Sequence, residues 1–245
     1  MLNLSKKVCL ITGCNGYLGK SICQLFKKLG ATVIGIDIIN KKNDNLDNFF
    51  KVDLNNKNQI DSLIKNLKKV KKIDVLVNNA AFLANSKINN TKEKKLFYNH
   101  KYENLNLTNT IYLTNYIIPF LRKSKNGSII NICSIYASLA YDYNLYKNTN
   151  MKPPLAYGVS KAGLKHYSKM LASIVSPKIR VNSISPGGIL RGQPKKFISK
   201  YLSKTPISRM AKEKDISNVV AFFASDYSIY ITGQDLIVDG GYSIS

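Results

Sequence analysis

Short apolar runs rich in β-branched residues alternate with amphipathic helical patterns along this chain, and this alternation narrows its possible folds more than any other feature. Val8 to Thr12 and Thr32 to Asp37 are two such runs. Between them, residues 17–29 repeat with the period of a helix that ends at Gly30. Repeated strand–helix units of this kind build one parallel sheet, with right-handed crossovers that place helices on both faces. We therefore predict an α/β fold, a doubly wound parallel sheet in three layers, α/β/α.

The rest of the chain continues the alternation. Strands are predicted over residues 73–77, 128–133, 178–183 and 235–238, and helices over residues 59–70, 102–123, 157–175 and 216–224. No Pro-, Gly- or Ser-rich linker interrupts the 245 residues, so we predict a single domain over 1–245. Two stretches, 135–156 and 187–213, have no regular period. Long loops after parallel strands commonly bind ligands, which makes these two the predicted substrate loops.

Composition argues against several classes of protein. The four cysteines, Cys9, Cys14, Cys23 and Cys133, lack CxxC spacing, so we predict neither a metal site nor disulfides. No apolar run approaches the roughly 18 residues that span a bilayer, and the N-terminal segment lacks the cleavage site of a secretory signal. We expect a cytoplasmic protein that has no membrane partner.

The formal net charge of +23 raises the question of nucleic-acid binding. Lysine is spread along the chain beside abundant Asn and Ile, and neither an RNP motif nor a zinc finger is present. We therefore expect no specific nucleic-acid partner. A positive field of this size can instead steer an anionic small-molecule substrate towards its site.

A glycine-rich turn, TGCNGYLG, follows the first predicted strand and opens the first predicted helix. Its first glycine allows a tight turn, its second lets the backbone approach a diphosphate, and its third lets the helix pack closely against the strand. The N–H groups at the start of that helix then face the phosphates. This arrangement is typical of a Rossmann dinucleotide site. We predict that the cofactor is bound there by Gly13, Asn15, Gly16, Tyr17, Leu18 and Gly19.

Asp37, at the end of the second predicted strand, indicates which dinucleotide binds. A carboxylate there can accept hydrogen bonds from both hydroxyls of the adenosine ribose, and it repels a 2′-phosphate. The glycine turn contains no Arg or Lys that would hold such a phosphate. NAD is therefore the predicted cofactor. Lys41 and Lys42 follow closely, which leaves NADP as the less favoured alternative.

Tyr157 and Lys161 lie one turn apart at the start of a predicted helix, so their side chains share a face. A free phenol has a pKa near 10, which is too high for a base at neutral pH. A neighbouring ammonium and an oxidised nicotinamide ring would stabilise the phenolate and lower that pKa. Tyr157 could then take a proton from an alcohol or return one to a carbonyl. The alternative interpretation of this common YxxxK pattern is a surface Tyr beside a solvated Lys.

Together with their neighbours, these motifs resemble the single-domain branch of the short-chain dehydrogenase/reductase family over essentially the whole chain. The matching segments are TGCNGYLG, KVDL, NNAA, NLNL, GSIINICS, YGVSK and SPGG. The resemblance implies a catalytic set of Asn106, Ser134, Tyr157 and Lys161. Asn106 would hold a proton-relay water, Ser134 would bind the substrate oxygen, and Lys161 would also bind the nicotinamide ribose.

The same resemblance implies further cofactor contacts beside the adenine, along the middle of the sheet and beside the nicotinamide. These residues are Asp53, Leu54, Asn78, Asn79, Ala80, Pro186, Gly187 and Ile189. It also implies a homo-oligomer, a tetramer or a dimer, that associates through the helix around Asn106 and the helix after Tyr157.

Three features depart from the usual family pattern. The GxxGxxG spacing resembles the sugar-nucleotide epimerase branch, although 245 residues leave no room for that branch's substrate domain. Leu190 and Arg191 stand where a Thr is usual after the Pro-Gly turn. The enlarged loop before Tyr157 is similar to a subgroup found with flagellin-modification and nine-carbon sugar acid pathways.

That loop contains four tyrosines that could contact a sugar or simply pack together: Tyr136, Tyr141, Tyr143 and Tyr146. In the later loop, Arg191 and Arg209 could hold a phosphate or a carboxylate, or remain solvated. We therefore predict an NAD-dependent oxidoreductase that interconverts an alcohol and a carbonyl on a sugar or sugar-phosphate-like substrate. Two alternatives stay open: a sugar-nucleotide epimerase or dehydratase that recycles its NAD, and a non-catalytic NAD-binding sensor.

Overall fold

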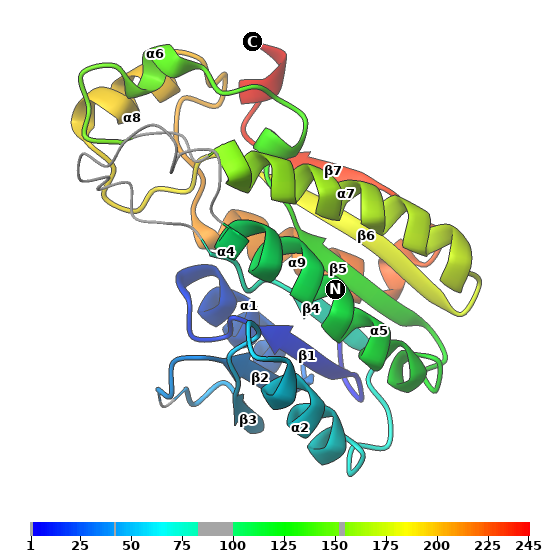
Figure 1. Cartoon of the computed structure of the whole chain (residues 1–245). Coiled ribbons are helices and arrows are strands. Elements are labelled where there is room, and N and C mark those ends of the chain that lie inside the picture. The colour runs from blue at the N-terminus through cyan, green and yellow to red at the C-terminus, as the bar shows by residue number, and fades with distance from the viewer. Residues whose placement is uncertain (1, 42, 83–99, 152–154) are drawn as a thin grey trace.

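The structure, a computed structural model, describes residues 2–41, 43–82, 100–151 and 155–245. In these residues, seven parallel strands form one sheet in the order β3-β2-β1-β4-β5-β6-β7 (Figure 1). The strands are β1 (Val8–Thr12), β2 (Thr32–Asp37), β3 (Asn48–Lys51), β4 (Val75–Asn78), β5 (Gly127–Ile132), β6 (Ile179–Pro186) and β7 (Asp235–Val238). The strand order reverses between β1 and β4, where a doubly wound sheet leaves a crevice at the carboxyl ends of its strands.

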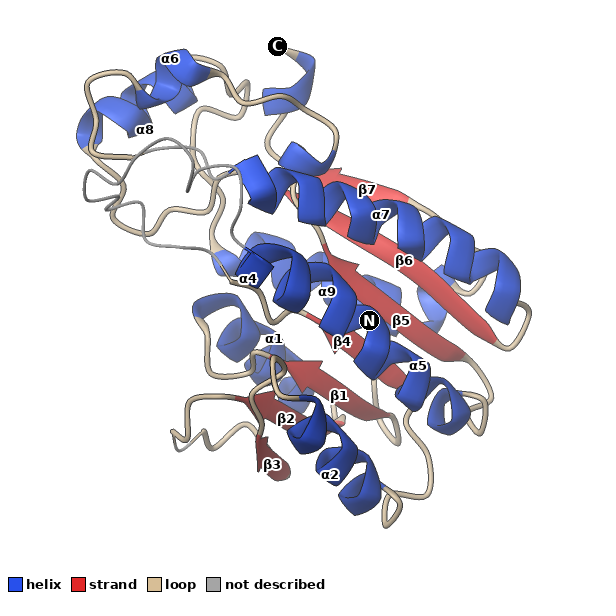
Figure 2. Ribbon diagram, in the orientation of Figure 1, coloured by secondary structure: helices blue, strands red, loops and turns tan. Residues whose placement is uncertain are grey.

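Helices cover both faces of the sheet (Figure 2). On one face α1 (Tyr17–Lys28) packs against α9 (Glu213–Ala224), and on the other lie α2 (Lys57–Leu67), α5 (Asn109–Leu121) and α7 (Leu155–Val175). The short helices are α4 (His100–Glu103), α6 (Tyr143–Tyr146) and α8 (Lys195–Leu202), with 3₁₀ turns at Ile135–Ala137, Asp226–Ser228 and Tyr242–Ile244. The predicted doubly wound, three-layer fold is confirmed. None of the described helices is both long and apolar enough to cross a membrane.

Two apolar layers hold the helices to the sheet, and the strands supply both. In β1, Cys9 and Ile11 pack towards α1 and α9, whereas Leu10 between them packs towards α2 and α5. Side chains alternate in this way because successive residues of a strand point to opposite faces. Both faces are covered, so the strand reads as a continuous apolar run rather than an alternating one.

Some elements differ from the sequence prediction. The edge strand β3 was not predicted, because four residues with only two half-buried side chains carry no clear period. Helix α8 lies inside the stretch 187–213 that shows no regular period in the sequence; its two turns bury only Phe197 and Tyr201. The helix predicted over 102–123 begins at His100 and contains a π-helical turn at Asn104–Thr108.

The two predicted substrate loops pack together beyond the carboxyl edge of the sheet, where α6 and α8 lie side by side (Figure 1). Lys200 Nζ donates to the carbonyls of Asn144 and Lys147 at 2.7 and 2.9 Å, and Lys204 pairs with Asp142. An apolar cluster lies between the loops and contains Ile135, Tyr136, Leu145, Tyr146, Phe197, Tyr201, Met210 and Tyr242. Residues 152–154 of the first loop lie outside the described residues.

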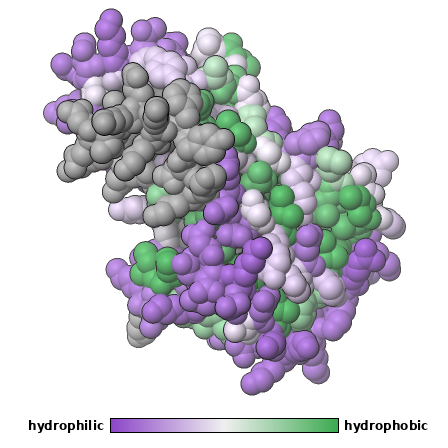
Figure 3. All heavy atoms as spheres, viewed as in Figure 1, coloured by the Kyte–Doolittle hydropathy of each residue, from purple (hydrophilic) through white to green (hydrophobic). Residues whose placement is uncertain are grey.

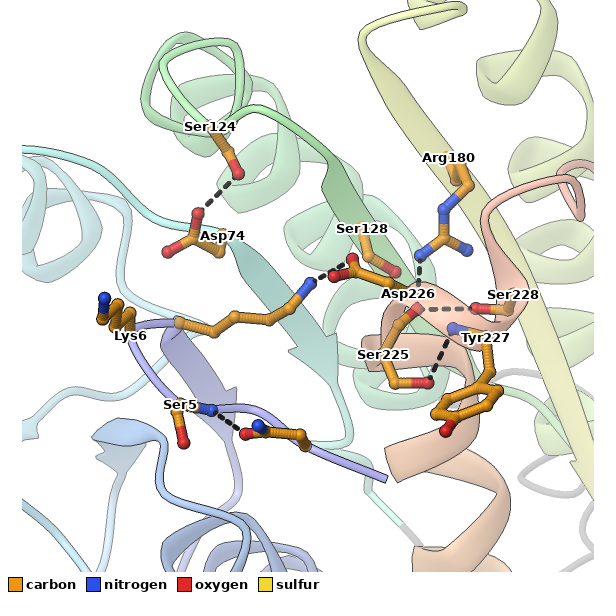
Figure 4. A network of polar contacts seen from close by, with 12 residues as sticks. Ser5, Lys6, Asp74, Ser124, Ser128, Arg180, Ser225, Asp226, Tyr227 and Ser228 are labelled. Atoms are coloured by element: carbon orange, nitrogen blue, oxygen red, sulfur yellow. Dashed lines mark hydrogen bonds and ion pairs between the residues drawn. The ribbon is translucent and has the colours of Figure 1, made fainter. Parts of the chain in front are cut away.

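At the opposite edge of the sheet, a polar network fixes the end of α9 (Figure 4). The buried Arg180 guanidinium donates to the carbonyl of Phe223 at 2.9 Å, and Lys7 pairs with Asp226 at 2.8 Å. A cation is favourable there because the last carbonyls of a helix carry partial negative charge. Arg180 is the second residue of β6 and Pro186 is the last, so this network lies at the amino ends of the strands, remote from the crevice.

Candidate active site

A cavity of about 1440 Å³ opens at the carboxyl ends of the strands, where the sequence predicts the cofactor site. The predicted site residues in its wall are Gly13, Gly16, Tyr17, Leu18, Gly19, Asp37, Asp53, Leu54, Asn79, Ala80, Ser134, Tyr157, Lys161, Pro186, Gly187 and Ile189. Three predicted residues, Asn15, Asn78 and Asn106, do not line it. The structure therefore brings together in one cavity segments that are far apart in the sequence.

Two glycines of the turn, Gly13 and Gly19, have no space for a side chain. Gly13 has a φ of +66°, and a Cβ there would lie 2.9 Å from Ala80 Cα. A Cβ on Gly19 would lie 2.0 Å from the Gly13 carbonyl oxygen. Gly16 caps α1 without a side-chain hydrogen bond, and the first turn of α1 has no acidic residue. The first turn of α1 therefore has no acidic side chain of its own to compete for its amide groups, and the glycine turn fits a diphosphate.

Asp37 lines the cavity with its carboxylate already oriented. Its Oδ2 accepts from the Asn15 N–H at 2.8 Å and its Oδ1 accepts from the Ile39 N–H at 2.9 Å. An ionised carboxylate has about four acceptor positions, so each oxygen can still accept from a hydroxyl. Asn15 itself holds the loop after β2, because its Nδ2 donates to the carbonyl of Ile39 at 2.8 Å.

Asp53 and Leu54 follow β3 and line the end of the cavity next to Asp37. The Asp53 carboxylate accepts from the Asn55 N–H at 2.8 Å, while the Asp53 N–H donates to Gln59 Oε1 at 2.8 Å. Leu54 is buried at 5% exposure. These contacts fix the turn that leads into α2.

The segment after β4 lines the cavity and also supports the glycine turn. Asn79 Nδ2 donates to the carbonyls of Thr12 and Gly13 at 2.9 and 3.1 Å, and the Ala80 N–H donates to Thr12 Oγ1 at 3.0 Å. Asn78 is buried, and its Nδ2 donates to Asn131 Oδ1 at 2.7 Å. Asn78 therefore cross-links β4 to β5 inside the sheet.

Ser134, Tyr157 and Lys161 meet at one place on the cavity wall. Ser134 follows β5, and its hydroxyl is hydrogen-bonded to the Tyr157 phenol oxygen. Lys161, one turn further along α7, donates from Nζ to the Ile132 carbonyl at 2.7 Å, and its Nζ is 5.8 Å from the centroid of the Tyr157 ring. The end of β5 and the start of α7 therefore place a hydroxyl, a phenol and an ammonium side by side.

Burial controls the titration of this group. Burial raises the pKa of Tyr157 to about 12, although the Ser134 hydrogen bond and the charge of Arg191 both lower it. Burial also lowers the pKa of Lys161 from its ordinary 10.5 to about 8. The sequence-based expectation of a lowered Tyr157 pKa does not hold for the protein alone, because desolvation outweighs the nearby charges. At neutral pH the phenol is therefore protonated and suited to donate a proton.

Asn106 is fully buried in the π-helical turn. Its Oδ1 accepts from the Phe82 N–H at 2.7 Å, and its Nδ2 donates to the Phe82 carbonyl at 3.2 Å and to Ser160 Oγ at 3.3 Å. The amide thus binds both backbone groups of Phe82 and ties them to α7. Single π turns often occur at functional sites, and the predicted water-holding role of Asn106 stays a prediction.

Known proteins share this architecture. A family model described as Enoyl-(Acyl carrier protein) reductase matches residues 16–243. The chain is 33% identical to "3-oxoacyl-(acyl-carrier-protein) reductase FabG" of Thermotoga maritima, over 99% of this chain and 100% of that protein. The chain belongs to the short-chain dehydrogenase/reductase family. It is also 30% identical to "Post-translational flagellin modification protein A" of Campylobacter coli, over 98% of this chain and 100% of that protein. A short-chain dehydrogenase of Leptospira borgpetersenii, solved with bound NAD+, matches with a TM-score of 0.86 and 31% identity, over 98% of this chain and 94% of that chain.

In this short-chain dehydrogenase/reductase, the cavity wall opposite the glycine turn is aromatic. The rings of Tyr136 and Tyr141 have centroids 4.1 Å apart, and the hydroxyls of Tyr136 and Tyr146 are 3.3 Å apart. The sequence prediction missed Phe197 and Tyr201, although their i, i+4 spacing in KKFISKYL is the signal that indicates them. Of the four predicted tyrosines, Tyr143 is 67% exposed and does not line the cavity.

The two arginines of the later loop have different environments. Arg191 lines the cavity, whereas Arg209 pairs with both carboxylate oxygens of Asp215 at 2.7 and 3.0 Å and lies outside the cavity wall. Arg209 is therefore not placed to hold a substrate anion. Within the described residues, no cluster of His, Cys, Asp and Glu has the arrangement of a metal site.

Proposed function

We propose that this protein is an NAD-dependent oxidoreductase that interconverts an alcohol and a carbonyl on a sugar or sugar-phosphate-like substrate. The observation that carries this proposal is that Ser134, Tyr157 and Lys161 lie together in the wall of the cavity that the glycine turn also lines. The test is to follow the absorbance of NADH while the protein turns over a panel of aldoses, sugar phosphates and their keto forms. Absence of turnover with NAD and NADP alike would count against the proposal, and would favour a binding protein.

The residues would divide the chemistry among them. The bound cofactor would supply the hydride acceptor or donor. Ser134 and Tyr157 would hydrogen-bond the reacting oxygen, which stabilises charge as it develops there. Tyr157 would exchange the proton with that oxygen. Lys161 would bind the nicotinamide ribose, and its ammonium, with Asn106, would connect the phenol to solvent.

Asp37 supports NAD as the cofactor in preference to NADP. Its carboxylate faces the cavity, is held by the Asn15 and Ile39 amides, and would repel a 2′-phosphate. The related Leptospira dehydrogenase was solved with NAD+. Titration calorimetry with NADH and NADPH tests this preference directly.

The aromatic wall supports a small hydroxylated substrate. Tyrosine rings offer an apolar face for packing against a sugar ring and a hydroxyl for its substituents. Tyr136 and Tyr146 line the cavity and hydrogen-bond to each other through their phenols at 3.3 Å, so their remaining donor and acceptor positions lie close enough together to bind neighbouring hydroxyls of one substrate. The formal charge of +23 suits an anionic derivative.

Reduction of a 3-oxoacyl thioester is the second candidate function, because the FabG relative bears that name. The two functions separate in one experiment with Tyr136→Phe and Tyr146→Phe. Loss of one phenol should raise KM for a sugar substrate roughly tenfold, the effect of about one hydrogen bond. It should leave the KM of a 3-oxoacyl thioester unchanged. Wild-type turnover of the thioester alone would establish the second function instead.

We also propose that the protein is a homo-oligomer, a tetramer or a dimer. Helices α5 and α7 expose large apolar side chains, among them Tyr116, Val159, Met170 and Ile174. Figure 3 shows hydrophobic atoms gathered over these helices. Light scattering coupled to gel filtration tests the assembly, and replacement of Met170 and Ile174 by Lys should shift it towards the monomer.

A further inference from the structure

The loop after β6 presents one arginine to the cavity in a fixed orientation. Gln193 Oε1 accepts from the Arg191 N–H at 2.7 Å, and Gln193 Nε2 donates to the Ile189 carbonyl at 2.7 Å. Directly before Arg191 in the chain, the Leu190 N–H donates to the Ala211 carbonyl at 2.9 Å. Bonds on both sides of Arg191 therefore fix its backbone.

The guanidinium of Arg191 is fixed as well. Its Nε donates to Glu213 Oε1 at 3.0 Å, and its Cζ lies 5.1 Å from the centroid of the Tyr17 ring. Glu213 begins α9 and Tyr17 begins α1, so the guanidinium bridges the starts of two helices on the same face of the sheet. Stacking on an aromatic face and pairing with a carboxylate both hold a guanidinium in one plane.

The bridge leaves part of the guanidinium available. The contact with Glu213 uses Nε, and neither Nη group donates to another described residue. The Arg191 side chain is 32% exposed, and it lines the same cavity as Gly13, Gly16 and Gly19. Four N–H bonds of a cation thus remain beside the turn whose shape fits a diphosphate.

The position of Arg191 favours the cofactor over the substrate as the partner of these N–H groups. Its stacking partner, Tyr17, is the first residue of the helix whose amides open onto the cavity. The reacting oxygen of a substrate would instead lie at Ser134 and Tyr157, and there the influence of Arg191 is electrostatic, because its charge lowers the pKa of Tyr157. An anion near the start of α1 is therefore the nearer partner.

We propose that Arg191 is a cofactor-binding residue whose Nη groups bind the dinucleotide diphosphate from the side opposite the glycine turn, with Tyr17 and Glu213 orienting it. This inference rests on the proposed binding of NAD. The contact would be charge-assisted and bidentate, the strong form of hydrogen bonding between an arginine and a phosphate. The diphosphate would then be held between backbone amides on one side and a cation on the other.

The test compares Arg191→Ala with Arg191→Lys and with the control Arg209→Ala, whose arginine lies outside the cavity. Titration calorimetry measures the Kd of NADH and of ADP-ribose, which has the diphosphate but no nicotinamide. Arg191→Ala should weaken both ligands roughly ten- to a hundredfold, the effect of losing hydrogen bonds to a charged group. Arg191→Lys should recover part of this affinity, and Arg209→Ala should change neither Kd. Added salt should weaken wild-type binding more than binding to Arg191→Ala.

Three results would overturn the proposal. Unchanged Kd values with a raised KM for the substrate would make Arg191 a substrate anchor. A loss for NADH without a loss for ADP-ribose would place the contact at the nicotinamide. If Arg191→Ala does not fold, Glu213→Gln replaces it, because this change frees the guanidinium from its clamp without altering the loop; unchanged affinity there excludes the orienting role. If the wild-type protein binds neither NADH nor NADPH, the proposed function itself fails, which is a different outcome from equal binding by wild type and variant.

Discussion

Lys161→Met should remove a buried charge that lowers the free energy of unfolding by an amount that depends on pH. The Lys161 side chain is 2% exposed, and its burial lowers its pKa from 10.5 to about 8. At 1.36 kcal/mol per pKa unit, this shift means that the charged ammonium destabilises the fold by about 3 kcal/mol at neutral pH. The hydrogen bond to the Ile132 carbonyl offsets part of that cost.

The direction of the pH effect follows from proton binding. Between the folded pKa of about 8 and the unfolded value of 10.5, the unfolded chain binds more protons than the folded one. The free energy of unfolding therefore rises with pH across this window. From pH 7 to pH 9.5, wild type should gain about 2 kcal/mol relative to Lys161→Met, because the ammonium loses its proton inside the fold.

Urea denaturation of the ligand-free protein at a series of pH values measures this difference. Lys169→Met is the matched control, since Lys169 lies on the same helix and is exposed in the folded state. The difference in free energy of unfolding between Lys169→Met and wild type should be the same at every pH. If the difference in free energy of unfolding between Lys161→Met and wild type is also independent of pH, the argument that α7 buries a charged ammonium at the site is refuted.

Three further changes test other parts of the account. Tyr157→Phe should lower kcat roughly 10²- to 10⁴-fold by removing the proton donor while the Kd of NADH, measured by calorimetry, stays unchanged; equal activity would exclude Tyr157 as the acid. Asp37→Ser should weaken NADH and strengthen NADPH, so that the ratio of their Kd values moves roughly tenfold; a constant ratio contradicts the assignment of Asp37 to the ribose. Gly19→Ala places a Cβ 2.0 Å from the Gly13 carbonyl oxygen and should lower the free energy of unfolding in urea by about 1–3 kcal/mol; wild-type stability there would show that the turn tolerates a side chain.

The sequence predicts the parts of the fold that depend on local pattern. β1 and β2 have the predicted bounds, because both are continuous apolar runs and a glycine-rich turn sharply ends β1. Gly30 ends α1 as expected, with a φ of +87° that a glycine adopts without strain. Elements that depend on tertiary packing were missed. β3 is defined by its pairing with β2, and α8 by the burial of Phe197 and Tyr201 under α6.

The candidate site divides in the same way. The motifs follow parallel strands, which end at the same edge of the sheet, so the sequence predicts that their residues share one site. Most of the predicted residues do line one cavity. Spacing does not show what each side chain contacts. It could not show that Asn106 turns from the cavity to bind Phe82, or that Asp215 engages Arg209. Nor could it show that burial would raise the pKa of Tyr157, since desolvation depends on the whole fold.

The crystal structure of the protein with NAD+ is the most direct test of the central claim. We predict that the diphosphate lies over Gly13 to Gly19 and that the nicotinamide ring lies beside the hydroxyls of Ser134 and Tyr157. A dinucleotide bound away from the cavity, or a nicotinamide ring out of reach of Tyr157, would contradict the account.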